Sequence, residues 1–397
     1  MLRPLPIANL GVYSLAIPMR VRFSHAAAER VCAEPVVVRI ELADHTVGYG
    51  ETHPRPYVTG ESHADVLRAI RETFVPILLD LRPAHFGEAI EAVAELPLTD
   101  AAGRVVTAAR AAVELALLDA YARAFDRSWD SIPGWLEEPR FGPPGSRDTA
   151  RFGVVISSMA PSRVAGFIRK VRLGRIRHFK LKVGDAEDHD RLLAAVRALR
   201  RGLERHTITL VVDANGAWEI EQAVDKLRSW EHLPITCVEQ PLPKDAGKDW
   251  GELARRTRLP LMADESLVTP DDAEWLIVHR GAGWFNLRIS KNGGLLPTLR
   301  LAATARRHGI ACQLGCMVGE TSILSAAGRW LLQWVPDIRL AEGSFGRFLL
   351  TDDVVRKPLR FSFGGRWAPM AGPGLGLDID ACRLRRLAVA PPIEMPF

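Results

Sequence analysis

Three successive apolar runs of the sequence each end in a carboxylate. The residues are Asp213, Glu239 and Asp264, and the intervals between them are 26 and 25 residues. Carboxylates gathered at one point raise one another's pKa, and a hard divalent cation resolves this conflict. An all-oxygen ligand set suits Mg²⁺ better than Zn²⁺, with Mn²⁺ as a substitute. The pattern therefore predicts a magnesium site, and the alternative for any one of these acids is a cap on the following helix.

Lysines precede and follow the three acids. Residues 179–183 alternate strictly between apolar residues and lysines, which places Lys180 and Lys182 on one side of a strand. Lys291 follows Asp264 by 27 residues, about one further strand–helix unit. Two lysines that point into an interior are unfavourable unless they serve a function. The order of lysines and acids along the chain predicts a metal with an amine on each side. Alternatively, Lys180 and Lys182 could lie on an exposed edge strand, and Lys291 could lie in a solvated loop.

These residue types suit removal of a proton from the carbon next to a substrate carboxylate. Loss of that proton builds charge on the carboxylate oxygens, and a cation placed there stabilises the charge where it is largest. A lysine can act as the base near neutral pH when neighbouring positive charge depresses its pKa. A lysine on each face of the substrate would permit racemisation, cycloisomerisation or β-elimination.

The elements that must position these residues alternate between strands and helices over about residues 151 to 350. Amphipathic patterns such as residues 191–203 predict helices between most of the apolar runs. This alternation predicts a parallel sheet, and at this length a closed barrel, whose strands open at their carboxyl ends on one face. The last helix is expected to be absent or altered, because residues 343–346 resemble a loop. The eight predicted strands are 152–156, 179–183, 208–212, 235–238, 261–263, 284–288, 310–314 and 339–341.

The first 130 residues predict a separate α+β unit. Residues 36–42 and 46–50 have the apolar pattern of strands, and residues 105–125 repeat small and apolar side chains at helical spacing. A Pro- and Gly-rich stretch at residues 138–148 is typical of a linker.

Composition limits the class of protein. The chain has 397 residues, 47% hydrophobic and 25% charged, so two structural units with a sizeable core are expected. No apolar run approaches the roughly 18 residues of a membrane helix, and residues 1–10 lack a secretory pattern. Five scattered cysteines indicate free thiols and predict a cytoplasmic location. The net charge of +5 comes without a long basic tract, so a small anionic molecule is the expected partner, with no nucleic acid and no membrane.

Together these motifs resemble the enolase superfamily, and within it the muconate lactonizing enzyme subgroup. The resemblance implies an α/β fold: a (β/α)7β modified TIM barrel at residues 145–354, with an α+β capping domain. Residues 1–140 and the returning tail 355–397 would form the cap, with lid segments near 18–25 and 55–60. It also implies a homo-oligomer. The motifs that carry it are Lys-Leu-Lys at 180–182, Asp-Ala-Asn at 213–215, Glu-Gln-Pro at 239–241, Asp-Glu-Ser at 264–266, Ser-Lys-Asn-Gly-Gly at 290–294 and Gly-Tyr-Gly-Glu at 48–51.

The resemblance also implies a role for each site residue. Lys182 and Lys291 would be the acid/base pair, with Lys180 beside them. The metal ligands would be Asp213, Glu239 and Asp264, supported by Asn215 and Glu265. The remaining candidates lie in the lid and at the mouth of the barrel. A second anionic group could be held by Arg20, Arg22, His25 or Arg55, and Tyr57 could form an apolar wall. Glu320 and Glu342 could contact the substrate, or they could serve only as helix caps or salt-bridge partners.

The implied activity is that of a Mg²⁺-dependent isomerase, either a cycloisomerase or an epimerase/racemase, acting on a small carboxylate. Dipeptide epimerases of the subgroup carry Asp-x-Asp after the last strand, whereas residues 342–346 here read Glu-Gly-Ser-Phe-Gly. Muconate cycloisomerases have an acid two residues before Phe-Gly, and here Glu342 lies three residues before Phe345. The alternatives are a lyase, such as an o-succinylbenzoate-synthase-like dehydratase, and a non-catalytic barrel that serves as a binding module.

Overall fold

The barrel forms the larger part of the molecule. The structure is a computed structural model that describes residues 4–25, 28–136, 138, 141–142 and 150–397. Its eight barrel strands are all parallel and neighbour one another in chain order. A parallel bridge between Phe152 and Ala341 joins the first strand to the last and closes the ring. The strands are β6 (Val154–Ile156), β7 (His178–Lys182), β8 (Thr209–Asp213), β9 (Cys237–Glu239), β10 (Leu261–Ala263), β11 (Trp284–Leu287), β12 (Ala311–Leu314) and β13 (Ile338–Ala341).

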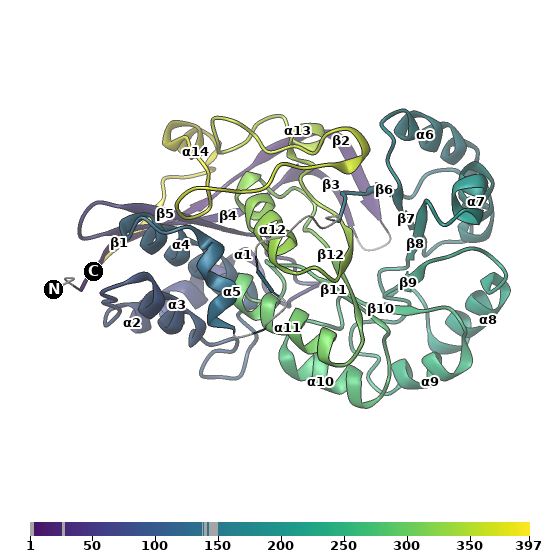
Figure 1. The fold of residues 1–397 in the computed structure, drawn as a ribbon, viewed down its shortest axis with the longest axis horizontal. Helices are drawn as coiled ribbons and strands as arrows, with labels where there is room; N and C mark the ends of the chain where they lie inside the picture. The colour runs from purple at the N-terminus through teal and green to yellow at the C-terminus, as the bar shows by residue number, and fades with distance from the viewer. Residues whose placement is uncertain (1–3, 26–27, 137, 139–140, 143–149) are drawn as a thin grey trace.

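Helices surround the strands on the outside, as Figure 1 shows at its right-hand side. Each of the first seven strands is followed by a helix, whereas β13 is followed only by the four-residue α13 (Gly346–Leu349). This is the predicted (β/α)7β barrel, with the last helix altered as expected. The seven helices are α6 (Pro161–Leu173), α7 (Asp188–Glu204), α8 (Ile220–Trp230), α9 (Asp249–Arg256), α10 (Pro270–Val278), α11 (Leu295–Arg307) and α12 (Ser322–Trp334).

The alternation of side chains along each strand divides inside from outside. A cluster of inward-facing apolar residues fills the barrel interior. Three of its members stand two residues before Asp213, Glu239 and Asp264, so the layer directly under the acids is apolar. The cluster consists of Val211, Cys237, Met262, Trp284 and Leu340. All five cysteines lie in the described part of the chain and are free, as predicted.

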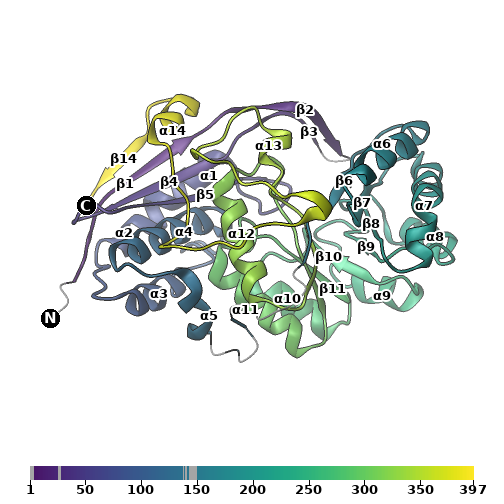
Figure 2. The same ribbon diagram turned by 45° about the horizontal axis from the view of Figure 1, so that its top comes forward.

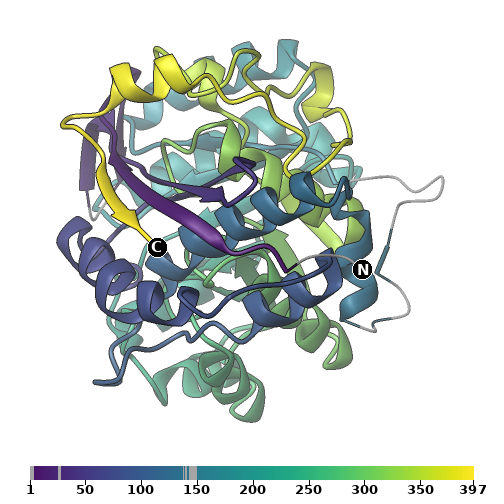
Figure 3. The same ribbon diagram turned by 90° about the vertical axis from the view of Figure 1, so that its left-hand side faces the viewer.

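The N-terminal region forms an antiparallel sheet in the order β14-β1-β4-β5. Its strands are β1 (Ile7–Ser14), β4 (Val36–Leu42), β5 (Val47–Thr52) and β14 (Ile393–Pro396). The last of these belongs to the tail, which reaches the sheet through α14 (Ala381–Leu387), after the 3₁₀ turn η3 (Phe363–Gly365). Figure 3 shows the yellow C-terminal strand beside the purple β1. The domain boundaries at 140, 145 and 354 remain a prediction, and most of the linker lies outside the described residues.

One long helix packs across this sheet. It is α4 (Thr107–Ala124), and it covers β5, where Gly48 and Gly50 permit a close approach. A Cβ atom at either glycine would overlap with the α4 backbone at Ala120 or Ala112. The smaller elements around it are α1 (His63–Ala69), the π-helical turn η1 (Ile70–Phe74), α2 (Val75–Leu78), α3 (Phe86–Ala94), the 3₁₀ turn η2 (Trp129–Ser131) and α5 (Ile132–Trp135).

A hairpin reaches from the N-terminal region toward the barrel. Strands β2 (Ile17–His25) and β3 (Ala28–Ala33) pair antiparallel and extend to the side on which β6 lies, as Figure 2 shows. Val21 of β2 lines the same cavity as Val154 of β6. In the part of the chain that the structure covers, no helix combines the length and apolar character that a membrane crossing requires.

Buried acids connect the N-terminal region to helix ends of the barrel. Glu51, at β5, accepts hydrogen bonds from Thr321 N at 2.8 Å and Leu324 N at 3.0 Å at the start of α12. Glu114, on α4, accepts one from Leu296 N at 2.8 Å at the start of α11. The first turn of a helix has unpaired N–H groups and a partial positive charge, so a carboxylate there is well placed.

Replacing Glu51 by alanine tests this connection. The change leaves the buried N–H groups of Thr321 and Leu324 without acceptors, so we expect the free energy of unfolding to fall by about 2–4 kcal/mol. Urea denaturation followed by tryptophan fluorescence measures the loss. Glu91→Ala is the matched control, because Glu91 is exposed on α3, and its effect should stay under about 0.5 kcal/mol. Equal losses in the two variants would show that Glu51 does not hold the regions together.

Candidate active site

Five charged side chains stand at the carboxyl ends of five consecutive barrel strands. Lys182, Asp213 and Glu239 are the last residues of β7, β8 and β9, and neighbours in this row pair in register. Asp264 and Arg288 immediately follow β10 and β11. The structure thus brings the three predicted acids to one face of the barrel, where each is fully buried.

Protein cations separate the acids. Lys182 Nζ lies 2.5 Å from Asp213 Oδ2, and Lys180 Nζ lies 2.6 Å from Glu239 Oε2 and 3.7 Å from Asp213 Oδ2. Arg288 Nη2 pairs closely with Asp264 and lies 3.7 Å from Glu239 Oε1. Each neighbouring pair of acids therefore shares one cation, so the three acids lie close together at the ends of adjoining strands.

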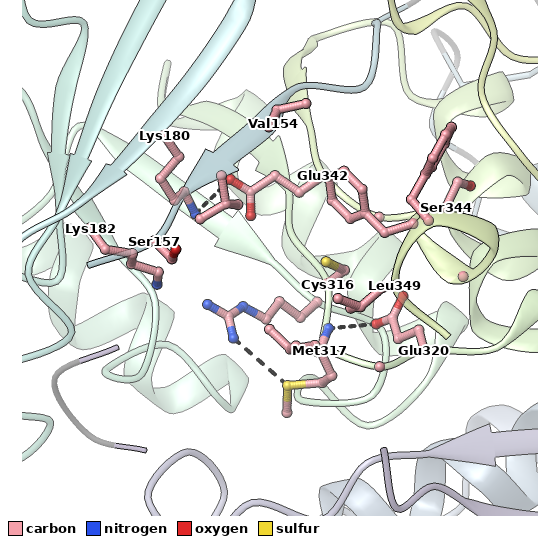
Figure 4. A pocket seen from close by; sticks show the side chains of 18 of the residues that line it. Val154, Ser157, Lys180, Lys182, Cys316, Met317, Glu320, Glu342, Ser344 and Leu349 are labelled. Atoms are coloured by element: carbon pink, nitrogen blue, oxygen red, sulfur yellow. Dashed lines mark hydrogen bonds and ion pairs between the residues drawn. The ribbon is translucent and has the colours of Figure 1, made fainter. Parts of the chain in front are cut away.

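Neighbouring charges shift the pKa values of the buried groups in the direction opposite to the effect of burial. Burial alone would raise the pKa of Asp213, but Lys182 and Lys180 outweigh it and hold that pKa below its usual value. Burial would lower the pKa of Lys180, yet Glu239, Glu342 and Asp213 raise it. Lys180 is therefore a fixed ammonium between the acids, and its Nζ also lies 2.8 Å from Glu342 Oε1 (Figure 4).

Amide side chains hold the charged groups in place. Asn215 Oδ1 accepts a hydrogen bond from Lys182 Nζ at 2.7 Å, and Asn215 Nδ2 donates to Glu265 Oε1 at 3.1 Å. Asn286 Nδ2 donates to Glu239 Oε1 at 2.9 Å. The other oxygen of Glu265 is buried without a partner, and burial raises the pKa of Glu265. The two predicted supporting residues, Asn215 and Glu265, thus connect the lysine to the cavity wall.

Gln240 fixes the end of the next strand. Its Oε1 accepts hydrogen bonds from Asp264 N at 3.0 Å and Ser266 N at 3.1 Å, and its Nε2 donates to Ser266 Oγ at 2.8 Å. Gln240 is fully buried and has a positive φ of 39°. In the sequence, Gln240 belongs to the Glu-Gln-Pro motif, which indicates no role for it; an amide directly after a candidate ligand was the available signal.

The structure places Lys291 differently from the sequence expectation. Its Nζ donates to the backbone oxygens of Asp264 at 2.7 Å and Asn286 at 2.8 Å, and to Asp264 Oδ1 at 2.9 Å. The side chain is fully buried and does not border the cavity. Arg288 stands in the expected place instead, because it directly follows a strand whereas Lys291 lies three residues farther along the loop. The available signal was the interval from Asp264 to Arg288 of 24 residues, which continues the series of 26 and 25.

The charged groups open into a cavity of about 370 Å³. Lys180, Lys182, Asn215, Glu265 and Arg288 border one part of it. Figure 4 shows Lys180 and Lys182 across the space from Cys316, Met317 and Glu320, and a dashed line marks the hydrogen bond of 3.7 Å from Arg288 Nη1 to Met317 Sδ. Much of the remaining wall is apolar, from Val21, Val154, Phe167, Met317, Val318, Phe345, Phe348 and Leu349.

The candidate substrate residues fall into two groups. Arg55, Tyr57, Glu320 and Glu342 border the cavity, as expected. Arg20 does not, since its guanidinium donates to Leu350 O at 2.8 Å and Thr351 O at 3.3 Å and so attaches β2 to the segment after α13. Arg22 and His25 belong to β2, but their side chains lie outside the part of the chain that the structure describes.

Arg55 is a buried cation that donates hydrogen bonds to two backbone oxygens and a histidine ring. Only 3% of it is exposed, and it donates to Pro54 O at 3.0 Å, Val318 O at 3.3 Å and His53 Nδ1 at 3.4 Å. Burial, with a contribution from Arg30, lowers the pKa of Arg55 to about 10, so it still carries its charge at neutral pH. Burial raises the pKa of Glu320 to about 8, so this carboxyl is protonated at neutral pH and can donate a hydrogen bond. The wall near Arg55 therefore favours an anion.

The donor set has the chemistry of a magnesium site, although the side chains are not arranged as one. Within the described residues, no three His, Cys, Asp or Glu side chains converge closely enough to hold a metal ion. Three buried carboxylates are nevertheless the hard oxygen ligands that Mg²⁺ prefers. Because Arg288 now supplies positive charge to Asp264 and Glu239, a cation bound there requires the guanidinium to withdraw.

Comparison with known families covers most of the chain. Residues 163–383 match the enolase C-terminal domain-like family, and residues 11–131 match the mandelate racemase / muconate lactonizing enzyme N-terminal domain. The enzymes of the enolase superfamily are generally magnesium-dependent.

Individual relatives extend over nearly the full length. The chain is 27% identical to the N-succinyl-L-Arg/Lys racemase of Bacillus cereus, over 96% of this chain and 98% of the relative. It is 28% identical to muconate cycloisomerase 1-2 of Acinetobacter lwoffii, over 97% and 96%. The crystal structure of the Bacillus cereus racemase superimposes with a TM-score of 0.85 at 25% identity and covers 98% of this chain and 100% of its own. The chain belongs to the enolase superfamily and, within it, to the muconate lactonizing enzyme subgroup.

Proposed function

We propose that the protein transfers a proton at the carbon next to a carboxylate of a small dianionic substrate, with Mg²⁺ held by Asp213, Glu239 and Asp264. The chain is an isomerase of the enolase superfamily, and its relatives named above are a racemase and a cycloisomerase. The observation that carries the proposal is that Lys182 borders the cavity and pairs with the buried Asp213, while the buried Glu239 and Asp264 stand at the ends of the next two strands.

Each charged group has a part in this reaction. A bound Mg²⁺ would supply positive charge to the substrate carboxylate and so stabilise the enolate. Lys182, which borders the cavity, takes the proton, and Asn215 orients it through the 2.7 Å hydrogen bond to its Nζ. Lys180 and Arg288, which also border the cavity, add permanent positive charge near the reacting carboxylate.

The cavity wall indicates the class of substrate. Arg55 offers a buried positive charge at one part of the wall, while the lysines mark another, so a molecule with two anionic groups fits both. The apolar side chains between them favour a nonpolar group on the substrate. N-succinyl derivatives of apolar amino acids combine these features. The N-succinyl-L-Arg/Lys racemase among the relatives supports the N-succinyl part of this class, and the apolar part rests on the cavity wall alone.

Lys182→Ala should abolish the proton transfer. With N-succinyl-L-phenylalanine in D₂O, we expect exchange of the α-proton to fall by about 10²–10⁴-fold, the usual contribution of a positioned base. Proton NMR measures the exchange. Lys170→Ala is the control, because Lys170 is exposed on α6, outside the cavity. Exchange at the wild-type rate in Lys182→Ala would remove Lys182 from its proposed role.

Asp213→Ala should weaken binding of Mg²⁺. Isothermal titration of chelator-treated protein measures affinity without turnover, and we expect a loss of at least about 10-fold, since one of three anionic ligands is removed. Asp271→Ala is the control, because Asp271 is exposed in the first turn of α10. If Asp213→Ala bound Mg²⁺ with wild-type affinity, Asp213 would not be a ligand of the metal.

Arg55→Met should remove the preference for a second anionic group. The matched substrates are N-succinyl- and N-pentanoyl-phenylalanine, which differ mainly by the distal carboxylate. In the wild type we expect kcat/KM for exchange of the α-proton in D₂O to favour the succinyl compound by about 10- to 100-fold, as for one charge-assisted hydrogen-bonded pair. The ratio should fall toward one in Arg55→Met. An unchanged ratio would show that the second anion lies away from Arg55.

A further inference from the structure

Among the described residues that line the cavity, lysine amines stand on only one of its two facing walls. Lys182 belongs to β7, and Arg288 follows β11, four positions away in either direction around the closed ring of eight strands. The two side chains therefore approach the cavity from opposite walls, and both border it. A substrate bound between them presents one face to Lys182 and the other to Arg288.

Lys291 is not available to the second face. A lysine ammonium has three N–H groups, and all three are used by Asp264 O, Asp264 Oδ1 and Asn286 O. Two of these acceptors are backbone oxygens from neighbouring strands, so the Nζ atom lies between β10 and β11 and not in the cavity. We assign Lys291 as a positioning residue that fixes the Asp264 carboxylate.

Arg288 cannot replace a second base. Its guanidinium offers five N–H donors and no acceptor lone pair, so it stabilises negative charge but does not accept a proton. Its Nε is buried without a partner, while its Nη atoms contact Met317 and the acids. The guanidinium of a residue that borders the cavity is suited to a carboxylate or enolate oxygen.

We propose that the enzyme moves its proton on one face of the substrate only, with Lys182 as the sole base and Arg288 as a fixed cation opposite. This inference rests on the proposed function and specifies its stereochemistry. The Lys182 amine takes the α-proton, and the C–H electron pair passes into the enolate. The same ammonium returns the proton to the same face, and the electron pair re-forms the C–H bond with retention.

The reaction class follows from this geometry. Racemisation requires delivery of a proton to the opposite face, whereas cycloisomerisation does not. In the opening of a lactone, Lys182 takes the α-proton, the C–H pair forms the C=C bond, and the β-carbon–oxygen bond breaks with its pair on the leaving carboxylate. The step consumes no other reactant. Its product has two carboxylates, and the buried charge of Arg55 can pair with the second one. The structure therefore favours a cycloisomerase over a racemase that uses two lysines, although a racemase is among its relatives.

The test follows both enantiomers of N-succinyl-phenylalanine in D₂O with the Mg²⁺-loaded protein. Proton NMR records loss of the α-proton, and chiral chromatography records inversion. We expect one enantiomer to exchange at least about 100-fold faster than the other and less than about 1% inversion per exchange event. Exchange of both enantiomers at similar rates, with interconversion, would overturn the one-face proposal but support the proposed function. No exchange of either enantiomer would overturn both.

Two variants separate the roles of Arg288 and Lys291. Arg288→Lys places an amine on the second face, so exchange of the slow enantiomer and inversion should both rise by at least about 10-fold. Lys291→Met should leave the ratio of exchange rates unchanged and lower Mg²⁺ affinity in isothermal titration by about 10-fold or more, as expected of a residue that orients a ligand. A variant Lys291→Met that loses exchange of one enantiomer while its Mg²⁺ affinity stays at the wild-type value would identify Lys291 as a second base.

Discussion

Burial of three carboxylates at the mouth of a barrel is the constraint on which the remaining structure depends. Asp213, Glu239 and Asp264 have an apolar layer beneath them, and an ion in such surroundings loses several kcal/mol of hydration. The chain meets this cost with positive charge from the adjoining strands, supplied by Lys180, Lys182 and Arg288. A divalent cation can replace part of this charge, and the same positive field then acts on a substrate carboxylate.

The N-terminal region completes the site that the barrel begins. Val21, Arg55 and Tyr57 border the cavity together with residues that follow barrel strands. Their positions depend on the contacts of Glu51 and Glu114 with the starts of α12 and α11, and on the return of β14 to the sheet. On the proposed function, the barrel would provide the proton chemistry and the N-terminal region would select the second anionic group, so that one could change without the other.

The fold was largely accessible from the sequence because its periodic signals are strong. All eight barrel strands were placed within about two residues, and β4 and β10 have the predicted bounds. The return of the tail to the N-terminal sheet came from family resemblance, since a four-residue strand such as β14 has no distinctive pattern of its own. The boundaries of the domains stay a prediction.

The site was less accessible, for a reason that Lys291 illustrates. Residue type identified a lysine at nearly the right interval, but strand ends are set by hydrogen bonding that sequence does not display. A displacement of three residues moves a side chain from the cavity wall to a place between two strands. Arg20 shows the same limit, because a lid arginine that contacts Leu350 and Thr351 cannot be distinguished by type from Arg55 at the cavity wall.

Anomalous diffraction from crystals grown with Mn²⁺ tests the central claim most directly, since Mn²⁺ takes the oxygen ligands of Mg²⁺ and is located without reference to turnover. The account predicts one strong peak bonded to Asp213, Glu239 and Asp264, with the Arg288 guanidinium withdrawn from Asp264. A peak bonded to other residues, or no peak while Arg288 still pairs with Asp264, would contradict it.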